Sequence, residues 1–292
     1  MTELVERSKG RMVERLKKEL IKYFKSLGIE VYTNTKARGH QGFFLQNRID
    51  ISKFTKEERV VPTLLHEFSH YIHQKLEPNM VKTGGSLEKL FNLSSVQLVS
   101  LLAMQSELLN VTSFVDQNSH MTKLKEHKAL MKKRIKVQEE IVKKYYPNFM
   151  RSKKFKEFDK YIKKTKAKYL LKYDRVKFIT PFLRREEFYS ISTIEQDFPD
   201  MPTAFCAYIR LKSAQKKQGR ISARINRLNK YYAKPTELFA RLVEGLYIDK
   251  EKVSEIAPHS TKRFFDLLEE GYYFELQEVF EMLRPNRQLA IF

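Results

Sequence analysis

The sequence predicts a mainly helical α+β protein with one small β-sheet. Apolar residues recur at helical spacing over most of the 292 residues. Strict alternation of apolar and polar residues, which is typical of strands, is confined to two short stretches, 29–34 and 43–51. Hydrophobic residues make up 42% of the chain, enough to bury a core and to exclude a disordered protein. The length fits one large domain or two small ones, at about 100–200 residues each.

Four elements are expected at the N-terminal end, in the order helix, strand, strand, helix. Residues 3–27 carry an apolar stripe among charges and stop before Gly28, which predicts an amphipathic helix. Residues 29–34 and 42–52 predict two paired strands separated by a glycine-bounded turn. The second helix is expected to begin just after Thr55, a residue type that caps helices. Its expected buried stripe consists of Val60, Val61, Leu64, Leu65, Phe68 and Ile72.

The remainder of the chain predicts helices interrupted by glycine and proline. Breaks at 77–79 and 84–85 end the first section, and three prolines interrupt the stretch between 181 and 202. The expected helices cover 95–109, 121–144, 153–171, 204–227, 236–247, 260–270 and 274–283.

The composition predicts a soluble, cytoplasmic protein. Cys206 is the only cysteine, which excludes an intrachain disulfide, and its apolar neighbours favour a buried hydrophobe. The first 18 residues are charged throughout and lack the apolar segment of a signal peptide. The longest uncharged stretch, 90–106, is too short and too polar to span a membrane.

The positive charge is concentrated in the middle of the chain. The formal net charge is +21, from 56 Lys and Arg against 35 Asp and Glu. Residues 121–176 contribute +14 and residues 211–230 contribute +7, so the rest of the chain sums to zero. This pattern favours an anionic partner for the middle section, with nucleic acid first and a membrane surface second. A pair of solvated helices remains the alternative, and no known nucleic-acid-binding signature is present.

The second predicted helix contains an H-E-x-x-H motif, His66-Glu67-Phe68-Ser69-His70. Two histidines four residues apart lie on one helical face, so both imidazoles can bind one metal ion. Glu67 lies about 100° around the helix from His66, where it can take a proton from a metal-bound water. The motif therefore predicts a Zn²⁺ site, with an accidental surface pair as the alternative.

A hydrolytic zinc site needs a third protein ligand and an open position for water. His73 is two turns from His66, roughly 10 Å along the axis, and is expected either at the rim of the site or next to the ligands without binding the ion itself. Glu237 is the best candidate, because it begins an amphipathic helix and small Ala240 on its face permits close approach. Glu244 is the alternative ligand. A first-turn glutamate that merely favours its own helix is the alternative interpretation of Glu237.

The segments TLLHEFSHYIH (63–73) and PTELFAR (235–241) resemble the minimal zincin core. Among zincins the chain is most similar to ImmA/IrrE-like metallopeptidases and to zincin-like domains of large polyvalent proteins on mobile elements. The resemblance covers 1–80 and 231–250, and it implies His66, His70 and Glu237 as zinc ligands with Glu67 as general base. It implies a core of helix, strand, strand and HExxH helix. The expected division is 1–80 for the N-terminal part of the core, 81–230 for a basic helical insertion and 231–292 for the helices that complete the metal site.

These observations predict a zinc metallopeptidase that hydrolyses peptide bonds, with Glu67 activating a zinc-bound water. The edge of the 42–52 strand could hold an extended peptide, which favours a protein substrate. An oxyanion donor is also expected, and the candidates for oxyanion or substrate contacts are His73, Tyr231, Tyr232, Arg241 and His259.

Two other functions are compatible with the sequence. The first is a nucleic-acid-associated binding module on a zincin scaffold without peptidase activity, in which 121–176 and 211–230 bind the anionic partner. The second is an effector or structural protein whose zinc only stabilises the fold.

Overall fold

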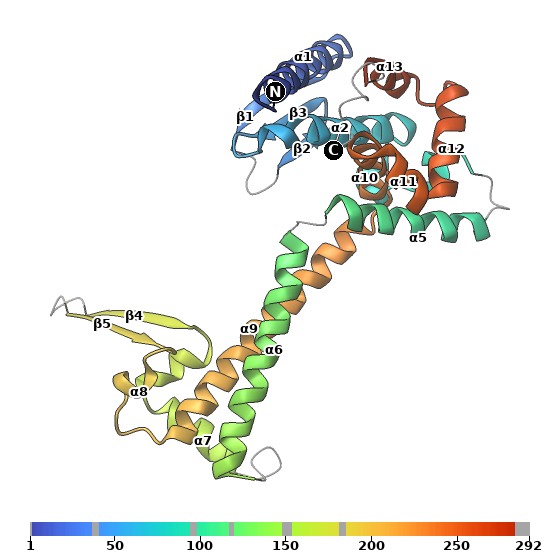
Figure 1. The fold of residues 1–292 in the computed structure, drawn as a ribbon. Coiled ribbons are helices and arrows are strands. Elements are labelled where there is room, and N and C mark those ends of the chain that lie inside the picture. Colours follow the sequence, from blue (N-terminus) through green and yellow to red (C-terminus); the bar gives the residue numbers. More distant parts are fainter. Residues whose placement is uncertain are drawn as a thin grey trace. The chain divides into compact units, whose positions relative to one another are not determined.

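The chain divides into two units, which are described separately. Unit 1 combines residues 1–117 and 229–292, and unit 2 comprises residues 118–228. The computed structural model describes residues 2–36, 41–93, 98–116, 120–147, 154–180 and 185–283 (Figure 1). The structure is mainly helical, as the sequence predicts, and it has a three-stranded and a two-stranded sheet where the sequence predicts one small sheet. No helix in these ranges is both long and apolar enough to cross a membrane.

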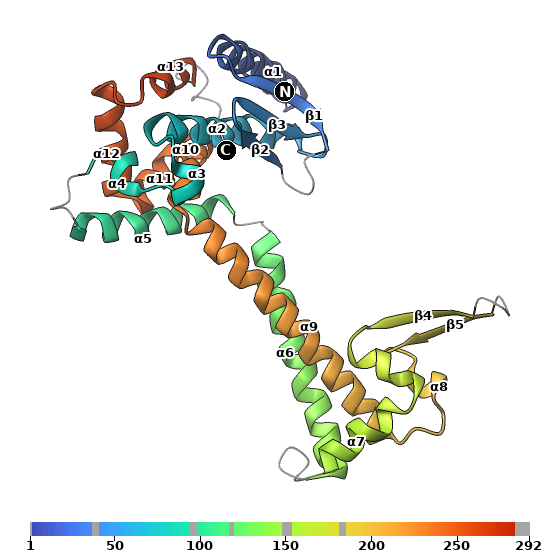
Figure 2. The same ribbon diagram turned by 180° about the vertical axis from the view of Figure 1, so that it is seen from behind.

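The first predicted boundary, at residue 80, differs from the structure. Helices α3 (Met80–Thr83), α4 (Leu87–Leu90) and α5 (Leu98–Val115) belong to unit 1 (Figure 2). They belong to unit 1 because their apolar side chains, among them Leu90 and Leu108, are buried in the same core as those of α2 (Glu57–Leu76) and α10 (Pro235–Ile248). The inserted unit therefore begins near 118, whereas its end at 228 lies close to the predicted 230.

The sheet of unit 1 has three strands where the sequence predicts two. Strand β1 (Glu30–Thr35) pairs in parallel with β3 (Arg48–Ser52), and β2 (Gly42–Leu45) pairs antiparallel with β3. The predicted single strand over 42–52 is thus a hairpin, because the chain turns at Gln46, whose φ is +55°. The strand order β1-β3-β2 places β3 in the centre and β2 at an edge.

Helix α2 (Glu57–Leu76) contacts both the sheet and helix α10 (Pro235–Ile248). The predicted stripe is buried from Val61 to Ile72, which confirms most of it, whereas Val60 is only partly buried. Lys56 rather than Thr55 occupies the N-cap position. Phe68 stacks on Phe24 of α1 (Thr2–Ser26) at a centroid distance of 4.2 Å. These contacts fix α2 in the core of unit 1 and so fix the side chains on its other face.

Three further helices complete unit 1. They are α11 (Lys250–Ile256), α12 (Pro258–Glu269) and α13 (Phe274–Leu283). Their buried residues join the core that contains α2 and α10. The sequence analysis predicts α12 and α13 and misses the short helix α11.

Unit 2 is built from long helices and one β-hairpin. Its elements are α6 (His120–Tyr145), α7 (Lys154–Lys163), the 3₁₀-helix η2 (Lys166–Leu171), β4 (Arg175–Thr180), β5 (Arg185–Ser190), α8 (Ile194–Asp197) and α9 (Thr203–Tyr232). The antiparallel β4–β5 hairpin is absent from the sequence prediction. A second core, which contains Phe158, Ile162 and Tyr208, holds this unit together. Cys206 is fully buried in it, as its apolar neighbours predict.

Candidate metal centre

Helix α2 presents both histidines of the motif on one buried face. The rings of His66 and His70 lie one turn apart, with centroids 5.0 Å from each other. The side chain of His66 is 9% exposed and that of His70 is 12% exposed. Spacing along the helix thus puts two imidazoles side by side in a place that solvent barely reaches.

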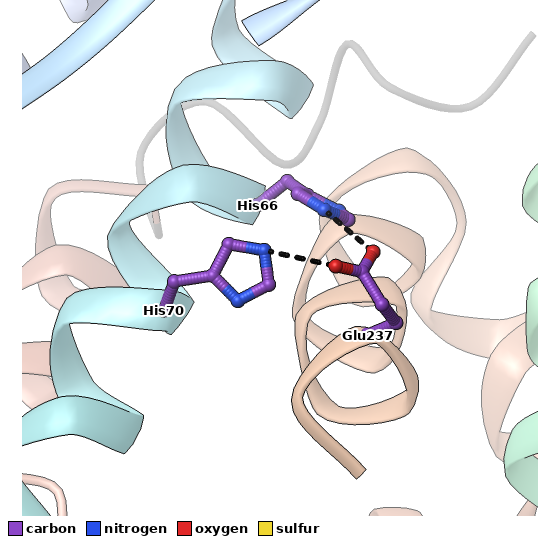
Figure 3. A group of neighbouring side chains, drawn as sticks. All are labelled: His66, His70 and Glu237. Atoms are coloured by element: carbon purple, nitrogen blue, oxygen red, sulfur yellow. Dashed lines mark ion pairs between the residues drawn. The ribbon is translucent and has the colours of Figure 1, made fainter. Parts of the chain in front are cut away.

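Glu237 faces the two histidines from the first turn of α10. Its Oε2 lies 3.5 Å from His66 Nε2, and its Oε1 lies 3.5 Å from His70 Nε2 (Figure 3). Pro235 begins the helix, and the fully buried Ala240 follows one turn after Glu237. The candidate ligand atoms of the three residues all lie within 4.8 Å of one another.

The donor set fits a Zn²⁺ ion. At zinc–ligand distances of about 2.0–2.1 Å, two ligands of a tetrahedral site lie about 3.4 Å apart, close to the two separations above. The 3.5 Å between each histidine Nε2 and the Glu237 carboxylate is long for a hydrogen bond. Glu237 Oε2 is buried and has no hydrogen-bond partner among the described residues. Two imidazoles and one carboxylate match catalytic zinc sites, which keep a fourth position open.

The electrostatics of the pocket also favour a bound cation. Burial would lower the pKa of His66, but the carboxylates of Glu237 and Glu244 outweigh it and raise that pKa. Burial lowers the pKa of His70 to about 4. Burial would also raise the pKa of Glu237, but its neighbours, chiefly His66, outweigh burial and lower that pKa to about 2. Arg59 and Arg241 pair with Glu244, so the buried Glu237 carboxylate beside the two imidazoles is the one that a proton or a metal ion would neutralise.

Glu244 contacts the His66 ring at Nδ1, whereas Glu237 faces Nε2 of the same ring. Its Oε2 lies 3.0 Å from His66 Nδ1, and the carboxylate also binds Arg59 at 2.6 Å and Arg241 at 2.9 Å. The sequence predicts Glu244 as the alternative ligand, but in the structure the Glu244 carboxylate accepts a hydrogen bond from His66 Nδ1–H, on the far side of the ring from Glu237. Such a pair fixes the tautomer in which Nε2 carries the lone pair that a metal needs.

Arg241 and Tyr232 are both partly buried and lie next to the Asp116 carboxylate, and Arg241 also contacts the Glu244 carboxylate. Arg241 Nη1 lies 3.3 Å from Asp116 Oδ1, and the guanidinium lies over the ring of Tyr232 at 5.6 Å from its centroid. Because Glu244 and Asp116 both pair with Arg241, we assign Arg241 a positioning role.

Tyr231 differs from Arg241 and Tyr232. It is 38% exposed, and burial together with the neighbouring Glu237 raises the pKa of its hydroxyl.

Of the two places expected for His73, the structure excludes the exposed rim of the site. It is fully buried, and its Nε2 lies 3.4 Å from Glu77 Oε2. Gly85, with φ of +75°, packs so closely that a Cβ there would lie 2.3 Å from the His73 ring. This burial excludes direct contact with a substrate in the structure described. His259, another candidate for oxyanion or substrate contacts, is exposed and paired with Glu107.

Glu67 is held against the edge strand of the sheet. It is 5% exposed, and a Cβ at Gly42 of β2 would lie 3.0 Å from its Oε1 and 2.7 Å from Thr63 Cγ2. Only glycine therefore leaves room for the carboxylate at this position. Burial raises the pKa of Glu67 to about 7. The contributions of Gly42, Arg59 and Asp116 are missed by sequence reasoning, because they depend on packing between distant segments.

Comparisons with protein-family models, curated proteins and solved structures found no match to this chain. The function must therefore be inferred from the residues of the site.

The Glu244–His66 contact predicts an effect on metal affinity. In Glu244→Gln the neutral amide is a weaker acceptor for His66 Nδ1–H, so we expect zinc affinity to fall by about 10- to 100-fold. Competition with a fluorescent chelator measures this change. Glu255→Gln, at an exposed position on α11, serves as the matched control and should bind zinc like the wild type. Equal zinc affinity in the two variants, with both folded by circular dichroism, would contradict the assigned role.

Proposed function

We propose that the protein is a zinc-dependent metallopeptidase that hydrolyses peptide bonds of a protein substrate. The observation that carries this proposal is the convergence of His66, His70 and Glu237 around one point, with Glu67 on the same helix. The three side chains would hold Zn²⁺. Zinc in such a site polarises a carbonyl group and lowers the pKa of a bound water toward neutrality.

Glu67 is the proposed general base and acid. Its carboxylate takes a proton from the attacking water and delivers that proton to the leaving amine. The contact with Gly42 holds the carboxylate in place before substrate binds. Because Glu67 is nearly buried, few waters compete for its oxygens.

Tyr231 is the oxyanion residue that we favour among the candidates, because it is 38% exposed, whereas His73 is fully buried and Arg241 is paired with Glu244 and Asp116. Burial, and after it the carboxylate of Glu237, raises the pKa of the Tyr231 hydroxyl. A neutral phenol at this position can donate a hydrogen bond to the oxygen of the scissile carbonyl as charge develops there.

Strand β2 supports a protein substrate. Among the described residues β2 pairs only with β3, so its outer edge is available for an added strand. An extended peptide on that edge would run past Gly42, and hence past Glu67. The backbone hydrogen bonds of such an arrangement recognise a chain rather than a small molecule.

Metal removal tests the proposal. The purified full chain, loaded with one equivalent of zinc, is incubated with a mixture of unfolded proteins, and new termini are identified by mass spectrometry. We expect cleavage that stops after treatment with a chelator and returns when zinc is restored. Zinc-loaded protein that cleaves no peptide bond in this mixture would favour the alternative, a binding module on the same scaffold.

A further inference from the structure

Almost all of the excess positive charge belongs to unit 2. This unit contains 30 Lys and Arg against 11 Asp and Glu, a net charge of +19, whereas unit 1 contains 26 against 24. The metal centre lies wholly in unit 1, so the proposed peptidase chemistry makes no use of this charge. The charge therefore needs a separate explanation.

Helix α6 carries an ordered row of lysines, here called the α6 lysine stripe. It consists of Lys125, Lys128, Lys132, Lys136 and Lys143, all of them exposed. At 3.6 residues per turn, these five side chains fall within an arc of about 80° and extend over about 27 Å. Two acids lie between Lys136 and Lys143: Glu139 falls inside this arc and Glu140 lies about 40° beyond its edge. The lysines from 125 to 136 thus form a continuous positive line, and Lys143 lies beyond the two acids.

Five of the eleven acids of unit 2 form ion pairs with other basic residues in the described part of the chain. In the described part of the chain none of the stripe lysines forms an ion pair. The ion pairs of this unit are instead Asp159–Lys163, Glu187–Lys166, Glu186–Lys177, Glu195–Arg210 and Asp174–Lys217. Holding five like charges together without counter-ions is unfavourable in isolation, and an anionic partner relieves it.

Helix α9 carries a second row of basic residues. Lys216, Arg220, Arg224 and Arg227 are exposed, and residues 211–230 contain no acid. Arg220 donates a hydrogen bond to the carbonyl oxygen of Lys172 and lies over the ring of Tyr173. The other three, in the described residues, form no ion pair. This second row extends the positive surface of the same unit.

We infer that the α6 lysine stripe binds the phosphate backbone of a double-stranded nucleic acid. A straight row of point charges suits the regular line of phosphates on a duplex. Single-strand binding relies on aromatic side chains that stack on bases, and the stripe contains none. A membrane-binding helix places apolar residues beside its lysines, whereas the exposed Leu130 and Val137 lie more than about 90° away around α6.

Salt-dependent binding of a labelled 20-base-pair DNA duplex of arbitrary sequence tests this inference. Wild-type full chain is compared with Lys125→Gln/Lys128→Gln/Lys132→Gln by fluorescence anisotropy. We expect micromolar or tighter binding by the wild type. The slope of log K against log salt is negative, and in the variant we expect it to become shallower by about 3, which is about one unit for each lost phosphate contact. The matched control is Lys18→Gln/Lys22→Gln/Lys25→Gln, which removes three exposed lysines from α1 of unit 1.

Several outcomes would overturn the inference. The first is binding by the wild type that does not change with salt, or no binding at all. Equal losses in the two triple variants would show that only net charge matters. Tighter binding to a single strand of the same length, or to vesicles of phosphatidylserine and phosphatidylcholine, would assign the stripe to another partner. None of these results depends on zinc, so the proposed peptidase activity is tested independently.

Discussion

Replacing Glu67 with glutamine is expected to reduce peptide hydrolysis by at least about 10³-fold while the protein keeps its zinc. The amide has nearly the shape of the carboxylate, so the side chain should still fit in the space beside Gly42. It lacks a basic oxygen, however, and cannot accept a proton from the attacking water. Glu67 is not among the three side chains that converge as metal ligands, so zinc content should stay at one ion per chain. Product formation and metal content are measured on the same sample.

Glu58→Gln is the matched control for this change. Glu58 lies on the same helix, is 70% exposed and pairs only with Lys56 in the described residues. The control should retain full activity, since it removes an equal charge from α2 without touching the site. Hydrolysis that persists in Glu67→Gln would exclude Glu67 as the base. A variant that loses zinc as well as activity would instead point to a structural role at the metal.

The fold could be predicted from the sequence wherever one periodicity continues through a whole element. The burial of Leu64, Leu65 and Phe68 follows from helical spacing alone. The hairpin of β2 and β3 could not be recognised in this way, because a two-residue turn leaves the alternation of apolar and polar residues in phase. The length of the predicted strand was the available signal, since eleven residues exceed the usual five or six.

The domain boundary illustrates a different limit. Helix α5 is apolar on most of its surface, and such helices are buried inside a core. Its position next to α10 nevertheless depends on residues more than one hundred positions away, which local patterns cannot relate. The change in charge near residue 120 marks the start of unit 2 better than the glycines at 84–85 do.

In the site, too, residues close in sequence could be placed from the sequence, whereas contacts between distant segments could not. His66, Glu67 and His70 lie within one helical turn and a half, so their spacing was enough to predict their arrangement. Glu244 required knowledge of how α10 packs on α2. One sequence signal was available: Glu237 and Glu244 are the only acids of a helix whose other charged residue is Arg241, and they lie seven residues apart, on one face. Two buried acids on one face indicate that both have partners.

The second large effect is expected from Glu237→Ala, which should weaken zinc binding by more than about 100-fold. The change removes one of three proposed ligands and leaves two histidines, which hold zinc poorly on their own. Metal content after gel filtration should fall from one zinc per chain to almost none. Thermal unfolding gives an independent measurement, because a ligand that binds only the folded state stabilises it by about 4 kcal/mol at 1,000 times its Kd. Added zinc should therefore raise the Tm of the wild type and leave that of the variant unchanged.

Glu251→Ala separates this role from a general effect on helix stability. Glu251 is an exposed acid in the first turn of α11, as Glu237 is a buried acid in the first turn of α10. Both substitutions remove a favourable interaction with a helix dipole, which is worth about 0.3–1 kcal/mol. Only Glu237→Ala removes a carboxylate that lies 3.5 Å from two imidazoles. If both variants kept their zinc, Glu237 would be a helix-stabilising residue and the third ligand would have to be sought elsewhere. Loss of zinc from Glu237→Ala alone would establish the His66, His70 and Glu237 ligand set on which the proposed peptidase activity rests.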